Sequence, residues 1–167
     1  MLGQAATSNS HYVGIAEMHI SANPTDVIIA PNLGSCLGVL AFDTKLKIGG
    51  LVHCLLPSST SDPEKAKLKP CTYVDTGVTV LLDTLFKKGA DRKTLIMVCV
   101  GGASLSDPNG VFEIGKKNFT ILRKLLWKNN LLLKAEDIGG ECCRTLTLEI
   151  ATGAVTLKSN GSTRKLV

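Results

Sequence analysis

Residues 26–56, DVIIAPNLGSCLGVLAFDTKLKIGGLVHCLL, contain three apolar runs separated by two short polar breaks. The second break, DTKLK, lies between two aliphatic runs and is typical of the turn of an antiparallel hairpin. The first break, NLGS, directly precedes Cys36. A cysteine in a core needs no polar residues before it, whereas a reactive cysteine needs access and nearby hydrogen-bond donors.

The hairpin predicts that Cys36 and His53 face each other. A two-residue turn at Thr44-Lys45 pairs Asp43 with Leu46 and, counted outward, Cys36 with His53. Directly opposed residues share one face of a sheet, with Cβ atoms about 4.5–5.5 Å apart. An imidazole at that distance favours the thiolate, which is the form of cysteine that attacks a carbonyl carbon. A shift of one residue removes this arrangement, so the interpretation depends on the register.

The NLGS break supplies groups that such a nucleophile uses. Gly34 permits a positive φ or a close approach of another backbone. The amides around Ser35 and Cys36 are candidates to hold a developing oxyanion. The residues alone leave the alternative open that Cys36 is a small core residue and that His53 is a buried, hydrogen-bonded one.

Composition limits the class of protein. The chain has 167 residues, of which 44% are hydrophobic and only 4% aromatic, which favours a single domain with an aliphatic core. The formal net charge is +5, but lysines and arginines are scattered and no aromatic residues are interleaved with them. We therefore expect no nucleic-acid partner, while a weak preference for an acidic protein partner stays open.

The six cysteines include no CxxC pair and fit no spacing of zinc ligands. We expect free thiols in the cytoplasm, with no metal and no cofactor. The N-terminus lacks the pattern of a signal peptide, and no stretch approaches the roughly 20 apolar residues of a membrane span. Direct membrane insertion is therefore not expected.

The remaining sequence predicts an α+β domain. Residues 1–10 are small and polar and are expected to form a flexible tail, and residues 11–167 a single domain. Strands are expected at 11–21, 94–100 and 131–137, helices at 75–89 and 113–130, an exposed loop at 57–70, and a hairpin at 143–159 that turns at 151–153. This order favours helices on one face of a sheet and further β-structure on the other.

Several blocks resemble the CheD family, the chemoreceptor glutamine deamidases of bacterial and archaeal chemotaxis. LGSCLGVLAFD and IGGLVHCLLP are similar to the LGSC and HxxLP signatures of that family. TYVDTGVTVLL, GGASLS, EIGKKN and LKAEDIGGECCRTLTLEIATGAV follow in the same order, so the resemblance covers roughly residues 13–157. It implies an α/β/β layered domain similar to the cytotoxic necrotizing factor class of cysteine deamidases, with Cys36 as nucleophile and His53 as base. It also implies two partners, the cytoplasmic region of a chemoreceptor and a CheC-type phosphatase.

One position departs from the family pattern. Members typically carry a threonine just before LGSC that is thought to orient the histidine, whereas this chain has Ala30 and Pro31 there. Neither side chain accepts a hydrogen bond, and Asn32 is the polar candidate for a Cys–His–Asn arrangement. Two alternatives follow: a regulatory module that mainly binds a CheC-type phosphatase, and a peptide-bond protease that uses the same dyad. The family resemblance favours the deamidase.

Overall fold

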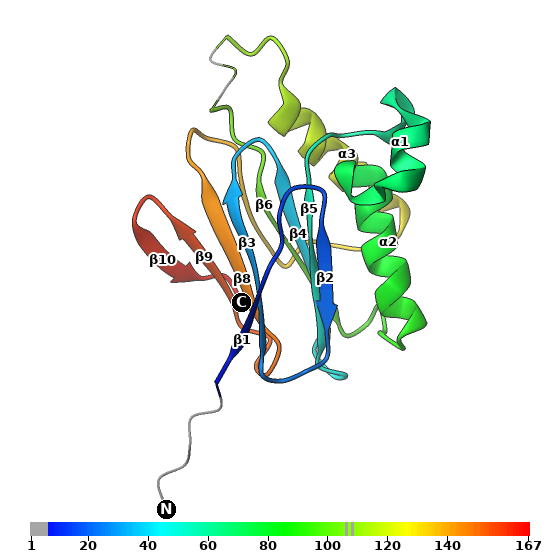
Figure 1. Cartoon of the computed structure of the whole chain (residues 1–167), viewed down its shortest axis with the longest axis vertical. Helices are drawn as coiled ribbons and strands as arrows, with labels where there is room; N and C mark the ends of the chain where they lie inside the picture. Colours follow the sequence, from blue (N-terminus) through cyan, green and yellow to red (C-terminus); the bar gives the residue numbers. More distant parts are fainter. Residues whose placement is uncertain (1–6, 106, 108) are drawn as a thin grey trace, which may run out of the picture.

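The computed structural model describes residues 7–105, 107 and 109–167. Its described part has three layers, in which helices cover one face of a central five-stranded sheet and a second, outer sheet covers the other face (Figure 1). The α/β/β arrangement predicted from the sequence is confirmed. The two cores lie between these layers, one on each side of the central sheet.

The secondary-structure elements follow in chain order. The strands are β1 (Asn9–Tyr12), β2 (Met18–Ser21), β3 (Asp26–Leu33), β4 (Leu37–Asp43), β5 (Ile48–Cys54), β6 (Leu95–Gly101), β7 (Ala135–Ile138), β8 (Arg144–Glu149), β9 (Val155–Ser159) and β10 (Ser162–Lys165). The helices are α1 (Pro63–Leu68), α2 (Val74–Lys87) and α3 (Ile114–Lys128), with 3₁₀ turns at η1 (Ser59–Ser61) and η2 (Pro70–Thr72).

Both sheets are mixed. The outer sheet has the order β1-β3-β8-β9-β10, and the central sheet has the order β2-β5-β4-β6-β7. Only β1–β3 and β6–β7 pair in parallel among these strands. Strands β4 and β5 thus lie in the middle of the central sheet, where neighbours cover them on both edges.

Strand β4 is apolar throughout because both of its faces are buried. Leu37, Val39 and Ala41 belong to the core against the helices, whereas Leu40 and Phe42 belong to the core between the sheets. A strand that is buried on two sides reads as a continuous apolar run rather than as an alternating one. Polar side chains in this strand and its neighbours therefore lie far from bulk water.

The N-terminal part of the chain differs from the expectation of one strand at 11–21. It forms β1 and β2, which lie in different sheets. Strand β1 begins at Asn9, so the expected tail through residue 10 is too long, and residues 1–6 lie outside the described part of the chain. The physical reason is the segment at 13–17, where Ala16 has a left-handed φ of 62° and the chain turns from one sheet to the other.

The segment at 57–70 is not the exposed loop that was expected. It contains η1 and α1, and Asp62 caps α1 by accepting a hydrogen bond from the amide of Lys65. Pro63 occupies the first helical position, where its missing N–H costs nothing. Pro63 thus starts α1 and Pro70 starts η2, so two of the prolines in this segment begin helical turns.

The C-terminal half largely follows the sequence expectation. Both long helices form, and β8 and β9 form the predicted hairpin. Strand β7 begins at Ala135, later than expected, and β10 was missed because all four of its residues are exposed and give no apolar pattern.

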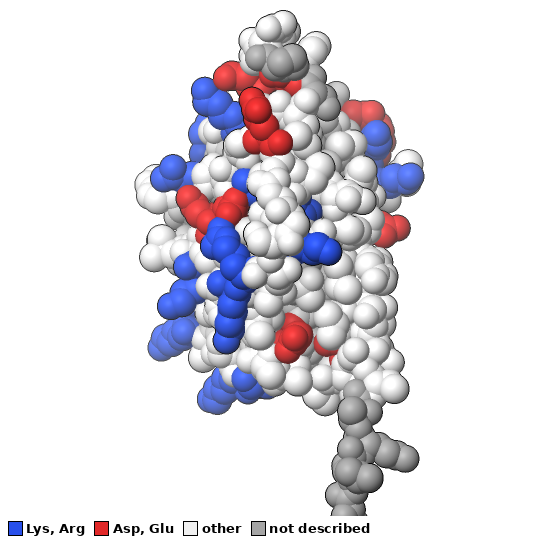
Figure 2. Space-filling model, turned by 90° about the vertical axis from the view of Figure 1, so that its left-hand side faces the viewer, with Lys and Arg blue, Asp and Glu red and all other residues white. Residues whose placement is uncertain are grey.

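Charge on the visible outer face is dispersed. Figure 2 shows lysines and arginines spread over one side of this face, with acidic groups among them and no continuous basic patch. None of the helices in the described part of the chain is long and apolar enough to cross a bilayer.

Candidate active site

The hairpin of β4 and β5 forms, but its register differs from the prediction. Asp43 pairs with Ile48 because a four-residue turn, Thr44–Lys47, replaces the expected two-residue turn. The Asp43 carboxylate stabilises this turn by accepting hydrogen bonds from two amides within it, both at 2.9 Å. His53 consequently lies opposite Gly38, and the predicted direct pairing with Cys36 is wrong.

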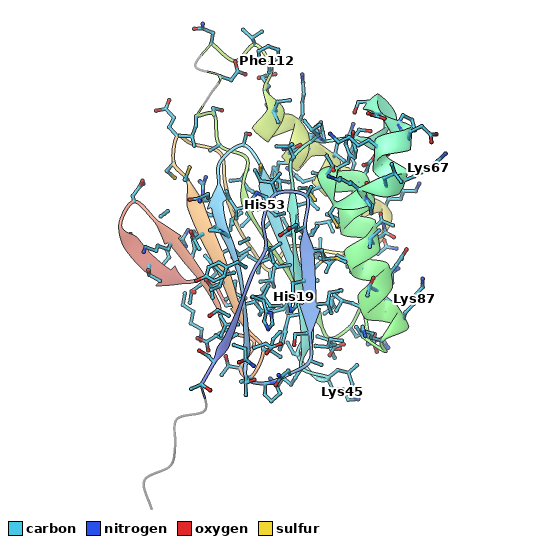
Figure 3. The ribbon with its side chains drawn as sticks, in the orientation of Figure 1. His19, Lys45, His53, Lys67, Lys87 and Phe112 are labelled. Atoms are coloured by element: carbon cyan, nitrogen blue, oxygen red, sulfur yellow. The ribbon has the colours of Figure 1, made fainter. Side chains whose placement is uncertain are left out.

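Cys36 and His53 nevertheless lie on the same face of the central sheet. The register is shifted by two residues, and an even shift keeps side chains on their predicted face. The two residues are diagonal neighbours, which long side chains bridge in sheets. Both are buried, with exposed fractions of 7% for Cys36 and 2% for His53, and this face packs against the outer sheet. Figure 3 places His53 between the two sheets.

Gly38 shapes the space beside this pair. A Cβ at that position would lie 2.6 Å from Leu33 Cδ1, a distance that real contacts do not reach. Leu33 belongs to the outer sheet and therefore packs directly on the backbone of the central sheet. Glycine at 38 is thus required for the close packing of the two sheets next to Cys36 and His53.

The loop that precedes Cys36 is held by its carbonyl groups. The amide of Ala103 donates to the carbonyl of Gly34, and the amide of Gly102 donates to that of Cys36, both at 2.9 Å. The preceding Gly101 has a φ of 120°, and a Cβ there would lie 2.1 Å from the Cys36 carbonyl oxygen. The GGA sequence after β6 therefore serves to bring a second backbone against the cysteine loop.

Asn118 of α3 holds the same loop from the helical side. Its Nδ2 donates to the carbonyls of Ser35 at 2.9 Å and of Leu55 at 3.1 Å. The side chain is fully buried, and its Oδ1 has no hydrogen-bond partner among the described residues. The sequence analysis missed this residue, although a polar residue on the buried face of an amphipathic helix is a usable signal.

The amide groups of residues 34–36 are left without acceptors. No hydrogen bond from these three N–H groups occurs within the part of the chain that the structure describes. Amides without acceptors beside a cysteine are suited to bind an anionic oxygen. This fits the role that the sequence analysis gave to Ser35 and its neighbours, which stays a prediction.

The ring of His53 is oriented by the main chain. Its Nδ1 lies 3.3 Å from the carbonyl oxygen of Val13, and its Nε2 is buried without a partner among the described residues. A carbonyl only accepts, so Nδ1 carries the proton and Nε2 is left as the basic nitrogen. The His53 backbone is held too, by hydrogen bonds with Ala16 and Glu17. The sequence could not reveal Val13, because its side chain plays no part.

Ala30, Pro31 and Asn32 lie in an irregular part of β3. The pairing with β8 breaks between Ala30 and Leu33, and Asn32 has a left-handed φ of 56°. Ala30 is fully buried, whereas Asn32 is exposed and forms no hydrogen bond with His53 within the described part of the chain. Gly34 does not have a positive φ, so the left-handed residue of this segment is Asn32. An orienting role for Asn32 stays a prediction.

Burial keeps both reactive groups neutral. It raises the pKa of the Cys36 thiol, an effect that the residue's own amide partly offsets. Burial lowers the pKa of His53, against the smaller opposing effects of the Val13 carbonyl and the Glu17 charge. Both shifts favour a thiol and a neutral imidazole near neutral pH, whereas the sequence analysis expected a thiolate, which stays a prediction.

A pocket opens beside this loop. It has a volume of about 150 Å³ and is lined by Ser35, Ala103, Ser104, Asp107, Phe112, Glu113, Ile114 and Gly115. Asp107 shapes its outer wall by accepting hydrogen bonds from the amides of Val111, Phe112 and Glu113. Phe112 is 64% exposed at the tip of this wall, at the opposite end of the molecule from Lys45 (Figure 3).

A family model described as CheD chemotactic sensory transduction matches residues 55–159. The chain belongs to the CheD family. It is 44% identical over 149 residues to the probable chemoreceptor glutamine deamidase CheD 1 of Syntrophus aciditrophicus, covering 89% of this chain and 93% of the relative. It is 43% identical over 155 residues to the probable chemoreceptor glutamine deamidase CheD of Solibacter usitatus, covering 93% and 92%. A CheD relative from Anaeromyxobacter dehalogenans is 36% identical over 147 residues.

The neutral pair predicts the order of cysteine alkylation. Iodoacetamide at pH 7 should label the exposed Cys143 before the buried Cys36, because a raised pKa and burial both slow the thiol. His53→Gln should slow labelling of Cys36 severalfold without changing Cys143, which serves as the control in the same tube. Peptide mapping after short exposure measures both rates. Fastest labelling at Cys36 would contradict a neutral thiol at this position. An unchanged labelling rate of Cys36 in His53→Gln would contradict the assistance of the imidazole.

Asn118→Ala should destabilise the fold and the loop together. It leaves the carbonyls of Ser35 and Leu55 without their donor, at a cost of about 1–3 kcal/mol for each buried group, so the free energy of unfolding should fall by roughly 2–4 kcal/mol. Thr120→Ala, which removes an exposed side-chain hydrogen bond from the same helix, should change it by less than about 0.5 kcal/mol. Urea unfolding followed by circular dichroism measures both. Equal losses of unfolding free energy in the two variants would contradict the proposed role of Asn118 in holding the loop.

Proposed function

We propose that this chain hydrolyses the side-chain amide of glutamine in chemoreceptors and converts it to glutamate. The activity is that for which its relatives are named. The alignments with these relatives cover most of this chain and most of each relative. The observation that carries the proposal is the state of His53, whose Nδ1 is hydrogen-bonded to Val13 while Nε2 is unpartnered on the face that it shares with Cys36.

In the first half of the reaction, the sulfur of Cys36 attacks the carboxamide carbon. His53 Nε2 takes the thiol proton as the S–C bond forms, so neither group needs to be charged beforehand. The amide oxygen becomes an oxyanion, for which the unpaired amides of residues 34–36 are the available donors. His53 then passes its proton to the amide nitrogen, the C–N bond breaks, and ammonia leaves from a thioester.

In the second half, water replaces ammonia. His53 Nε2 takes a proton from the water, and the oxygen attacks the thioester carbon. The C–S bond breaks, the sulfur recovers the proton from His53, and glutamate is released. The Nδ1 hydrogen bond to Val13 stabilises the imidazolium that forms in each half, which is the task that a side-chain acceptor performs in related triads. The reaction therefore does not require a side-chain acceptor at the positions of Ala30 and Pro31.

The substrate that we propose is the cytoplasmic region of a chemoreceptor, which places this chain in the cytoplasm. The pocket beside Ser35 is small, as a single side chain requires, and the exposed Phe112 lines it. Leu105 and Val111 are also exposed and are the sequence neighbours of the lining residues Ser104 and Phe112. We propose that these three exposed residues contact the receptor surface around the glutamine. Binding of a CheC-type phosphatase is a further proposal and does not require the thiol.

The deamidase is tested by incubating the tag-free chain with a purified receptor cytoplasmic fragment. The intact mass of the fragment should rise by the difference between an amide NH₂ and an acid OH at each modified site. Cys36→Ala and His53→Gln should each lower kcat by about 10³-fold or more, because the two groups act as a unit. The control variant Cys143→Ser removes an exposed cysteine and should leave kcat unchanged.

Three results would contradict the deamidase. Shorter fragments would identify a protease, and equal deamidation by Cys36→Ala would exclude the thiol mechanism. No mass change with any receptor fragment, together with tight binding to a CheC-type phosphatase, would leave the regulatory module as the function.

A further inference from the structure

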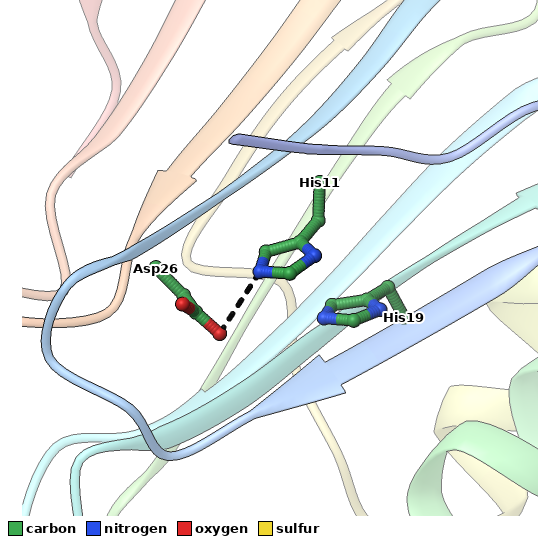
Figure 4. A group of neighbouring side chains, drawn as sticks. All are labelled: His11, His19 and Asp26. Atoms are coloured by element: carbon green, nitrogen blue, oxygen red, sulfur yellow. Dashed lines mark ion pairs between the residues drawn. The ribbon is translucent and has the colours of Figure 1, made fainter. Parts of the chain in front are cut away.

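Three metal-ligating side chains meet at an edge of the sandwich, apart from Cys36 and His53. They are His11 of β1, His19 of β2 and Asp26 at the start of β3, and their ligand atoms all lie within 4.8 Å of one another. Figure 4 shows the two imidazole rings stacked face to face with Asp26 beside His11. The ring centroids are 4.1 Å apart and the ring planes differ by 13°.

The contact between His11 and Asp26 is an ion pair whose geometry leaves the ring nitrogen poorly satisfied. His11 Nε2 lies 3.1 Å from Asp26 Oδ2, yet this nitrogen is buried and has no hydrogen-bond partner among the described residues. A buried ring nitrogen without a partner is rare and needs a cause. The two atoms form an ion pair when His11 is protonated, and their separation also suits two ligands of one cation.

The carboxylate of Asp26 is fixed from outside the cluster. Ser21 Oγ donates to Oδ2 at 2.6 Å, and Asn9 Nδ2 approaches Oδ1 at 3.3 Å. The side chain is only 9% exposed, so its charge is largely removed from water. Hydrogen bonds of this kind hold metal ligands in position in proteins.

We propose that His11, His19 and Asp26 bind a Zn²⁺ ion. Two imidazoles and one carboxylate form a donor set that zinc uses with water as a fourth ligand, whereas calcium and magnesium prefer oxygen ligands alone. Ligands of a tetrahedral zinc stand about 3.4 Å apart, since each lies about 2.0–2.2 Å from the metal. The His11–Asp26 pair already has this spacing, and the ligand atom of His19 lies within 4.8 Å of both.

The three ligands come from both sheets. His11 and Asp26 lie in the outer sheet and His19 in the central sheet, so one ion would fasten the two sheets together. Residues 13–17 connect β1 with β2 and carry the carbonyl that orients His53. The ion would fix both ends of this connection. An effect of the ion on catalysis through His53 rests on the proposed function, whereas zinc binding itself does not.

Metal binding is measured by calorimetry with ZnCl₂ on the tag-free chain carrying Cys142→Ser and Cys143→Ser, which removes the adjacent thiols nearest the surface. One Zn²⁺ should bind per chain. His11→Gln and His19→Gln should each weaken binding by at least about 10-fold, because each removes a ligand. His53→Gln removes an imidazole outside the cluster and should not change the affinity. Unchanged binding in the double variant His11→Gln/His19→Gln would reveal an adventitious site and overturn the proposal.

A second measurement needs no substitution among the ligands. The ring C–H signals of His11 and His19 should shift in the proton NMR spectrum when Zn²⁺ is added to the Cys142→Ser/Cys143→Ser chain, while those of His53 should not. Added Zn²⁺ should also raise the melting temperature of that chain. Signals of His11 and His19 that stay in place at saturating Zn²⁺ would overturn the proposal even if the variants fail to fold. Deamidation activity is not needed for either readout.

Discussion

The central sheet is buried on both faces, and the chemistry of the site follows from this constraint. Strands β4 and β5 lie between helices on one side and a second sheet on the other, so any polar side chain on them loses its water. A charged thiolate–imidazolium pair is expensive to keep there, because burial penalises both charges. Burial therefore favours the neutral form of each group, and in the proposed reaction the proton moves as the sulfur attacks the substrate. Its hydrogen bonds come from the main chain, which is the nearest source of polar groups in such a core.

Main-chain contacts replace side chains at two points of the site. The Val13 carbonyl orients His53, and the amides of Gly102 and Ala103 hold the carbonyls of the cysteine loop. Among the described residues, Asn118 joins this framework from the helices by donating hydrogen bonds to carbonyl groups. The framework draws on three distant segments, so the reactive loop is positioned by the tertiary fold and not by its own sequence.

This origin explains what the sequence could and could not predict. The layered fold, both long helices and the β8–β9 hairpin follow from apolar patterning, which the sequence displays directly. The shared face of Cys36 and His53 was predicted from an assumed turn and was kept because the register error was two residues. The register of β4 and β5 could not be predicted from the apolar pattern, because it depends on the Asp43 carboxylate stabilising a longer turn. Val13 was invisible because a carbonyl leaves no trace in residue identity. The cluster of His11, His19 and Asp26 was missed because each residue lies on a different strand, so no local spacing joins them.

The central claim is that a main-chain carbonyl holds His53 as a neutral base with its proton on Nδ1. Long-range ¹H–¹⁵N correlation spectra of the histidine rings test this directly, with the signals of His53 assigned by their loss in His53→Gln. At neutral pH we expect a protonated Nδ1 and a bare Nε2. A ring protonated on Nε2 alone, or on both nitrogens, would contradict the account, because His53 could not then accept the proton of Cys36.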